Sequence, residues 1–267
     1  MPPVTVGVIT GTGTYALPGF EESPPERVAT RFGEALVSRG RIGDAEVLHI
    51  SRHGEGHTRL SNHVTHRANV CALAELGAQC VIGVTVCGAV DPTVPLGSLI
   101  VFDDLHFLAN RLADGALCTL YDTPGDPRRG HWIYESPFSE ELRTILLDAA
   151  RAGPVDVRDG GCYGHVDGPR FNTRAEIRTL SLAGVTAVSQ TAGPETVLCG
   201  EAELPYALLG YATDYANGVK EEATPVEELI RLIAASTDVF AGVLAAAVPR
   251  AARAAPGQAG VMYRFEE

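Results

Sequence analysis

The sequence predicts an α/β domain in which helices flank a central mixed, largely parallel sheet. Segments of strand length alternate along the chain with segments of helical periodicity, as expected when helices cover the faces of a parallel sheet. Residues 80–86, CVIGVTV, are apolar almost throughout, which is typical of a strand covered on both faces. The chain shows neither an internal repeat nor a break in composition, so we expect one domain over residues 1–267.

Length and composition limit the classes of function. The 267 residues are 45% hydrophobic and 20% charged, which is ordinary for a globular protein. The net charge of −12 argues against binding to nucleic acid or to an anionic membrane, because both need basic surface. No apolar run reaches the length of a membrane span, and no basic segment opens a signal peptide. The six cysteines form no C-x-x-C pair and fit reduced thiols, so we expect a cytoplasmic protein.

The first third of the chain is expected to hold three strands and a helix before the apolar strand at 80–86. Residues 4–9 are β-branched and apolar, and they lead into the loop T-G-T-G-T. Residues 34–39 and 45–50 are predicted to be two strands joined by a turn. The apolar positions within 65–76 recur at helical spacing, which indicates a helix.

The rest of the chain continues the alternation. Further strands are expected at 98–102, 185–189 and 206–213. Helices are expected at 139–152, from the capping box at Thr173 to 183, from 193, and from 224 onward. Residues 163–170 are predicted to be a glycine-rich loop. Residues 105–138 are irregular, and such a long loop in a compact domain is usually functional or covers something.

Histidines gather around the stretch R-H-G-E-G-H-T, which begins at Arg52. An arginine fork beside His53 at a strand end can hold an oxyanion. Taken alone, the stretch is compatible with a metal site, a phosphate clamp or a plain polar loop. Open α/β sheets bind ligands at the carboxyl ends of their strands. The other loops that follow predicted strand ends lie at 10–14, 85–89, 189–195 and 213–217.

Six stretches on or near these loops together resemble one family. They are GVITGTGT from Gly7, RHGEGHT from Arg52, VTVCGA from Val84, DGPRFNTRAE from Asp167, QTAGPE from Gln190 and ATDY from Ala212. They follow one another in the order found in that family. On these motifs the chain resembles the trimeric purine nucleoside phosphorylases, and among them the 5′-methylthioadenosine phosphorylase branch. The resemblance implies a nucleoside phosphorylase-like fold.

The resemblance also implies phosphorolysis, in which phosphate attacks C1′ of a purine nucleoside and releases the purine and a pentose 1-phosphate. Hydroxyl, backbone N–H and guanidinium donors suit a bound dianion. By resemblance, the phosphate lies among Thr12, Arg52, His53, Thr85, Val86 and Thr191. No metal or cofactor is implied, since inorganic phosphate is a co-substrate, and the metal interpretation of the histidines loses its support.

For the base, the informative residue is Asp214. Family members that act on 6-aminopurines have aspartate at this position, and those that act on 6-oxopurines have asparagine. A carboxyl group can accept from N6–H and, when protonated, donate to N7, so Asp214 favours adenine. Asp214 and His53 are the expected catalytic residues. Phe171 is expected to stack on the purine, although ordinary core packing would also suit an apolar ring.

The sugar side is expected to be partly apolar. Family members that accept a 5′-hydroxyl place a histidine at the start of the last long helix, where this chain has Val226 and Leu229. These two suit a 5′-methylthio or 5′-deoxy group, although both could be plain core residues of an amphipathic helix. His57 is expected near the sugar. His131 matches a position that reaches the neighbouring subunit's site, which implies a homotrimer.

Three positions depart from the family pattern. Gln190 replaces a methionine that packs against the sugar, and a buried amide needs partners. We expect Gln190 to bind a ribose hydroxyl, another substrate group or an ordered water. Ala216 replaces a second aspartate, and Ser189 replaces an asparagine. These changes leave the identity of the nucleoside open.

The expected function is therefore phosphorolysis of 5′-methylthioadenosine or a related 5′-deoxyadenosine, with small molecules as partners and neither nucleic acid nor membrane. A phosphorylase for 6-oxopurines (inosine, guanosine or methylthioinosine) is the alternative. A nucleoside-binding homologue with weakened catalysis is a third hypothesis, which Gln190 and Ala216 would favour. A dinucleotide-dependent dehydrogenase lacks support, because Gly11 and Gly13 do not form a G-x-G-x-x-G loop.

Overall fold

The computed structural model describes residues 4–14 and 20–265, and it confirms the predicted α/β class. Among these residues, twelve strands form one mixed sheet, and two further strands, β9 (His131–Ile133) and β14 (Val261–Tyr263), form a separate pair. The strands of the large sheet are β1 (Thr5–Thr10), β2 (Glu21–Glu22), β3 (Glu26–Thr30), β4 (Gly33–Ile42), β5 (Ala45–Ser51), β6 (Ala78–Ala89), β7 (Leu99–Val101), β8 (Asp104–His106), β10 (Val157–Asp159), β11 (Cys162–His165), β12 (Val185–Ser189) and β13 (Tyr206–Tyr215). The helices are α1 (His66–Glu75), α2 (Glu140–Arg151), α3 (Arg174–Leu182), α4 (Ala192–Glu201) and α5 (Val226–Ala254), with short 3₁₀ turns η1 (Glu55–His57) and η2 (Ser61–His63).

The long strand β6 is the centre of the large sheet. Its first part lies between the parallel strands β1 and β13, within the order β10-β7-β13-β6-β1-β5-β4-β2. Its last residues pair antiparallel with β12, where Ala187 lies opposite Ala89. Most positions of β6 are buried, as predicted for a strand covered on both faces.

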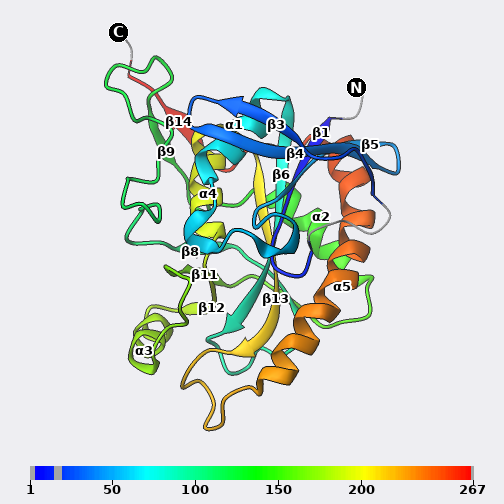
Figure 1. Ribbon diagram of the computed structural model, residues 1–267, viewed down its shortest axis with the longest axis vertical. Helices are drawn as coiled ribbons and strands as arrows, with labels where there is room; N and C mark the ends of the chain where they lie inside the picture. Colours follow the sequence, from blue (N-terminus) through cyan, green and yellow to red (C-terminus); the bar gives the residue numbers. More distant parts are fainter. Residues whose placement is uncertain (1–3, 15–19, 266–267) are drawn as a thin grey trace.

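Helices cover both faces of the sheet. Figure 1 shows α2 and α5 along one side and α1 and α4 along the other. Leu146 of α2 and Leu244 of α5 share one buried cluster with Val47, whereas Leu73 of α1 belongs to a second cluster with Leu48. Neighbouring residues of β5 thus point into different cores, because side chains alternate along a strand.

Local sequence signals hold for most elements, with one clear exception. The capping box that opens α3 is present: Glu176 N–H donates to the Thr173 hydroxyl, and Thr173 N–H donates to the Glu176 carboxylate. The prediction of a loop at 163–170 is wrong in its first part, since Cys162–His165 forms β11. Gly164 lies there against Val185, where a Cβ atom would collide, so this glycine reflects close packing rather than a turn.

Helix α5 is long and apolar enough, by length and composition alone, to cross a membrane. Charged residues such as Arg231 and Asp238 interrupt it, which is why the sequence shows no continuous apolar run of that length. One of its faces carries Leu232, Phe240 and Leu244 into the core against the sheet. The apolar content of α5 is therefore that of a helix packed within the domain.

Candidate active site

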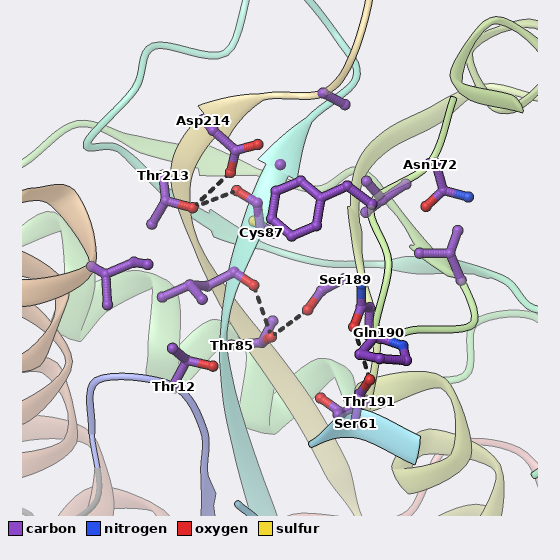
Figure 2. A pocket seen from close by; sticks show the side chains of 18 of the residues that line it. Thr12, Ser61, Thr85, Cys87, Asn172, Ser189, Gln190, Thr191, Thr213 and Asp214 are labelled. Atoms are coloured by element: carbon purple, nitrogen blue, oxygen red, sulfur yellow. Dashed lines mark hydrogen bonds between the residues drawn. The ribbon is translucent and has the colours of Figure 1, made fainter. Parts of the chain in front are cut away.

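A cavity of about 310 Å³ opens among the strand ends that the sequence marked as ligand-binding. Its lining comes from the loops after β1 and β5, the second half of β6, and the ends of β12 and β13. Figure 2 shows Thr12, Thr85 and Thr191 at one end of this cavity and Thr213 and Asp214 at the other. We refer to these as the threonine end and the aspartate end.

Eleven of the thirteen predicted site residues line this one cavity. They are Thr12, Arg52, His53, His57, Thr85, Val86, Phe171, Gln190, Thr191, Asp214 and Leu229. Val226 and His131 do not line it. Val226 is 64% exposed on the first turn of α5, and His131 lies on β9 beside Phe265. The expectation for His131 concerned a neighbouring subunit, so it stays a prediction.

The guanidinium of Arg52 is buried beneath the threonine end. Its Nε and Nη2 donate to the two carboxylate oxygens of Glu195, at 2.6 and 2.8 Å, and both side chains are 1% exposed. Nη1 donates to the carbonyl of Val84 at 2.8 Å, and Nη2 also donates to the carbonyl of Ile9. Burial would lower the pKa of Arg52, but the Glu195 carboxylate raises it, so Arg52 carries its charge.

His53 is a neutral ring with one nitrogen already assigned. Nδ1 lies 2.8 Å from the carbonyl of Arg59, and because a carbonyl only accepts, Nδ1 carries the proton. Burial, and next the charge of Arg52, lower the pKa of His53 to about 4. Near pH 7 the lone pair of Nε2 is therefore available as an acceptor. The ring stacks on His57, with 4.3 Å between the ring centroids.

Three hydroxyls and a helix terminus supply further polar groups at the threonine end. The Thr85 hydroxyl lies 2.9 Å from that of Ser189 and 3.0 Å from the carbonyl of Val86. Thr191 lines the cavity and is the residue before α4, and its side chain caps no N–H of that helix. Helix α4 therefore begins at the cavity wall, and the amino end of a helix favours a negative charge.

The aspartate end is shaped by a bulge in β13. Ala212 lies opposite Cys87 and Asp214 lies opposite Gly88, so Thr213 is an extra residue in the strand. The Thr213 hydroxyl donates to Asp214 at 2.9 Å (Figure 2). Burial raises the pKa of Asp214, so its carboxyl group stays protonated to a higher pH than it would in water.

Phe171 and two amides complete this end. Phe171 is 63% exposed although it lines the cavity, so its ring stands at an open edge rather than in a core. Asn172 and Asn217 line the same region, and Asn217 donates from Nδ2 to the carbonyl of Asn172 at 2.7 Å. Exposure of an aromatic ring to water is unfavourable, which favours binding of an apolar or aromatic ligand against Phe171.

Gln190 lies in the wall between the two ends. Its Oε1 accepts from the Ser61 hydroxyl at 2.8 Å, and its Nε2 donates to the carbonyl of Arg170 at 3.0 Å. The amide thus has protein partners on both sides, whereas the sequence led us to expect substrate or water. Apolar side chains also line the cavity: Leu60 from the segment after β5, and Leu229 and Ile233 from α5.

Comparison with known proteins agrees with this arrangement. A family model described as the phosphorylase superfamily matches residues 5–249. The chain belongs to the phosphorylase superfamily. The resemblance to nucleoside phosphorylases that the motifs indicated is thereby confirmed, together with the expectation of an enzyme of the pentosyltransferase class.

Relatives of this phosphorylase carry two kinds of name. A 6-oxopurine nucleoside phosphorylase from Pyrococcus furiosus is 31% identical over 249 residues, which is 91% of this chain and 92% of the relative. An S-methyl-5′-thioadenosine phosphorylase from Saccharolobus solfataricus is also 31% identical, over 88% of this chain and 85% of the relative. The solved structure of methylthioadenosine phosphorylase from Schistosoma mansoni with adenine has a TM-score of 0.81 and 27% identity, covering 94% of this chain and 96% of that one.

Several residues of the phosphorylase cavity were missed from the sequence. Ser61 carried no signal of its own, because only the fold brings it to the cavity. Asn172 stands in the stretch DGPRFNTRAE, but nothing local assigns its amide to the cavity. Ile233 follows Leu229 by one helical turn, so the periodicity of α5 could have found it. Glu195 stands in the quoted stretch QTAGPE, but its partner Arg52 is 143 positions away. Within the described parts of the chain, no group of three or more His, Cys, Asp or Glu side chains could hold a metal ion.

Proposed function

We propose that this phosphorylase cleaves a 6-aminopurine nucleoside, 5′-methylthioadenosine or a related 5′-deoxyadenosine, with inorganic phosphate. The observation that carries the proposal is Asp214, a carboxyl with a raised pKa at the end of the cavity opposite the threonines. Such a carboxyl accepts from an exocyclic amine with one oxygen and, when protonated, donates to N7 with the other. The S. solfataricus relative and the S. mansoni structure, both named for methylthioadenosine, support this choice.

In this proposal phosphate occupies the threonine end. Hydroxyls of Thr12, Thr85 and Thr191 and the backbone of Val86 donate to its oxygens, and the dipole of α4, which begins after Thr191, favours the negative charge. His53 accepts a hydrogen bond from hydrogen phosphate at Nε2, because its Nδ1 donates to the carbonyl of Arg59. No protein cofactor is required for this chemistry, since phosphate is the second substrate.

A phosphate oxygen forms a bond to C1′ while the C1′–N9 bond breaks, and the electron pair of that bond leaves with the purine. The protonated Asp214 donates its proton to N7 and so neutralises the leaving purine. The hydrogen phosphate proton, released as the ester forms, passes to solvent, and the Asp214 carboxylate takes a proton from solvent, which regenerates the acid and closes the proton count. The sugar ring becomes cationic in the transition state, and the phosphate beside it supplies the stabilising negative charge.

The 5′ group of the sugar is proposed to lie against Leu60, Leu229 and Ile233. This apolar wall suits a methylthio or methyl group better than a hydroxyl, whose hydrogen bonds it would not satisfy. We further propose a homotrimer in which His131 reaches the cavity of a neighbouring subunit, and a cytoplasmic location. A trimer of this kind would bring His131, which is exposed on β9, to a wall that one chain leaves open.

A panel of nucleosides tests this function. The purified enzyme is incubated with phosphate and, in turn, methylthioadenosine, adenosine, methylthioinosine, inosine and guanosine, and free purine is measured. We expect the largest kcat/KM for methylthioadenosine, with adenosine below it. Faster cleavage of inosine or guanosine would refute the 6-aminopurine assignment, and binding of a nucleoside without turnover would favour a weakened homologue.

A 6-oxopurine phosphorylase is the second candidate. The P. furiosus relative carries that name, and the amides of Asn172 and Asn217 at the aspartate end can serve an oxo base as well as an amino base. The absence of a second carboxylate at Ala216 also fits it. The methylthioinosine arm of the panel separates the candidates, because it changes only the base while the 5′ group stays the same.

A further inference from the structure

Glu195 does not line the cavity, but it forms an ion pair with Arg52, which does. Arg52 is the only lysine or arginine among the described residues that line the cavity. Glu195 takes both its Nε and Nη2 hydrogens in a two-point ion pair, with neither side chain more than 1% exposed. The hydroxyl of Tyr206 donates to the same carboxylate at 3.1 Å.

The donors of Arg52 are almost fully used by the protein. A guanidinium has five N–H groups, and the two bonds to Glu195 and those to Val84 and Ile9 occupy four of them. The fifth belongs to Nη1. That atom lies against Gly11, where a Cβ atom would collide with it, so it faces the loop after β1. Arg52 can therefore offer one hydrogen bond at the threonine end, while its charge is paired below.

The other basic groups around the pair do not restore a positive charge. Burial, and next Arg52 itself, lower the pKa of His53 to about 4. His66 lies 4.0 Å from Glu195, and burial, followed by the charges of His165 and Arg52, lowers its pKa well below the usual value. Both rings are neutral at pH 7, so the carboxylate of Glu195 is matched by Arg52 alone.

We infer that Glu195 is a positioning and charge-balancing residue for phosphorolysis: it fixes Arg52 beneath the phosphate and cancels its charge. The inference rests on the phosphate site proposed above. A phosphate held by hydroxyls, backbone N–H groups and one guanidinium N–H is bound in place but keeps most of its negative charge. That charge then acts on the cationic sugar of the transition state instead of on a neighbouring arginine.

The inference predicts an unusual effect of Glu195→Gln. The amide keeps the shape but leaves the charge of Arg52 uncompensated, so the oxyanion binds more tightly in the ground state and helps the sugar less. We expect the KM for phosphate and the inhibition constant of sulfate to fall about tenfold, and kcat to fall by a similar factor. A role limited to stability would raise both constants, and that result would overturn the inference.

A double variant protects the test, because Glu195→Gln leaves an unpaired buried charge and can fail to fold. Arg52→Gln alone leaves the Glu195 carboxylate to repel phosphate, whereas Arg52→Gln with Glu195→Gln removes both charges. We expect the phosphate KM of the double variant to be about tenfold below that of Arg52→Gln. Equal values for the two would overturn the inference.

The matched control is Glu201→Gln, on the same helix. The Glu201 carboxylate accepts from Thr119 and from the N–H of Leu120, away from Arg52, so its phosphate KM should stay at the native value. Thr191→Val separates this inference from the proposed phosphate site. If Thr191→Val leaves the phosphate KM unchanged, the site itself is misplaced; if Thr191→Val raises it while Glu195→Gln does too, only the role of Glu195 fails.

Discussion

Ser61 donates a hydrogen bond of 2.8 Å to Oε1 of Gln190, which lies 129 positions further along the chain. Gln190 in turn donates to the carbonyl of Arg170, the residue before Phe171. The amide therefore ties the segment after β5 to the loop that carries the exposed aromatic ring. It satisfies its polar atoms within the protein and fixes the edge against which a purine would stack.

Ser61→Ala should loosen this tie and weaken binding of the nucleoside. One neutral hydrogen bond is lost, so we expect the KM for the nucleoside to rise about two- to tenfold while the KM for phosphate changes little. Initial rates at varied concentrations of each substrate measure both constants. In the variant Ser61→Ala with Gln190→Met, the two effects should be less than additive, because each change removes the same Ser61–Gln190 hydrogen bond, and only the bond from Gln190 to Arg170 is lost in addition. Additive effects would show that Ser61 and Gln190 act independently.

Asp214→Asn should shift the base preference from amino to oxo. An asparagine cannot supply a proton to N7, but its amide can donate to a 6-oxo group, so we expect kcat/KM for methylthioadenosine to fall about 100-fold or more and the ratio of methylthioinosine to methylthioadenosine to rise. Purine release from the two nucleosides measures this ratio. An unchanged ratio would contradict the role assigned to Asp214.

The same residue predicts a pH dependence. Burial raises the pKa of Asp214, and the proton donor is its protonated form. The kcat/KM for an adenine nucleoside should therefore decline as pH rises through that raised pKa. Asp214→Asn removes the titrating group, so its residual activity should lack this decline. A profile in which the wild type and the variant fall in parallel would assign the decline to another group.

The apolar wall can be tested with a matched pair on α5. Ile233→Ser places a hydroxyl in the cavity wall, and we expect about a tenfold loss of kcat/KM for methylthioadenosine with a smaller loss for adenosine. Val226→Ser changes the same helix at a position that is 64% exposed and does not line the cavity, so its kinetics should match the wild type. A loss at Val226 equal to that at Ile233 would show that the variants act through the helix as a whole.

The sequence was most informative about polar residues at the ends of predicted strands, because parallel strands bring such ends together. These residues include the T-G-T-G-T loop, the pair Arg52 and His53, and Asp214. It was least informative where the partner is distant in the chain. Nothing local to Arg52 shows that Glu195 takes its charge, and nothing local to Gln190 shows Ser61. Val226 fitted a helical pattern, but the rotation of α5 places Leu229 and Ile233 at the cavity instead.

Buried neutral histidines predict a loss of stability in acid. Burial lowers the pKa of His165 to about 3, from an ordinary value of 6.5. Below pH 6.5 the unfolded chain therefore binds a proton that the folded chain does not, so stability is retained above that pH and lost as pH falls toward 3. Between pH 6.5 and pH 5 this histidine alone should cost about 2 kcal/mol at most.

His165→Gln tests this origin of the acid sensitivity. The amide is neutral throughout the range, so the difference in free energy of unfolding between pH 7 and pH 5, from urea titrations, should shrink by about 1–2 kcal/mol relative to the wild type. His63→Gln is the control, because it makes the same substitution at an exposed histidine. If the pH dependence of His165→Gln equals that of the wild type and of the control, His165 is not the source of the acid sensitivity. The remaining groups with shifted pKa values are then responsible: His53 and His66, or ion-paired carboxyls such as Glu176.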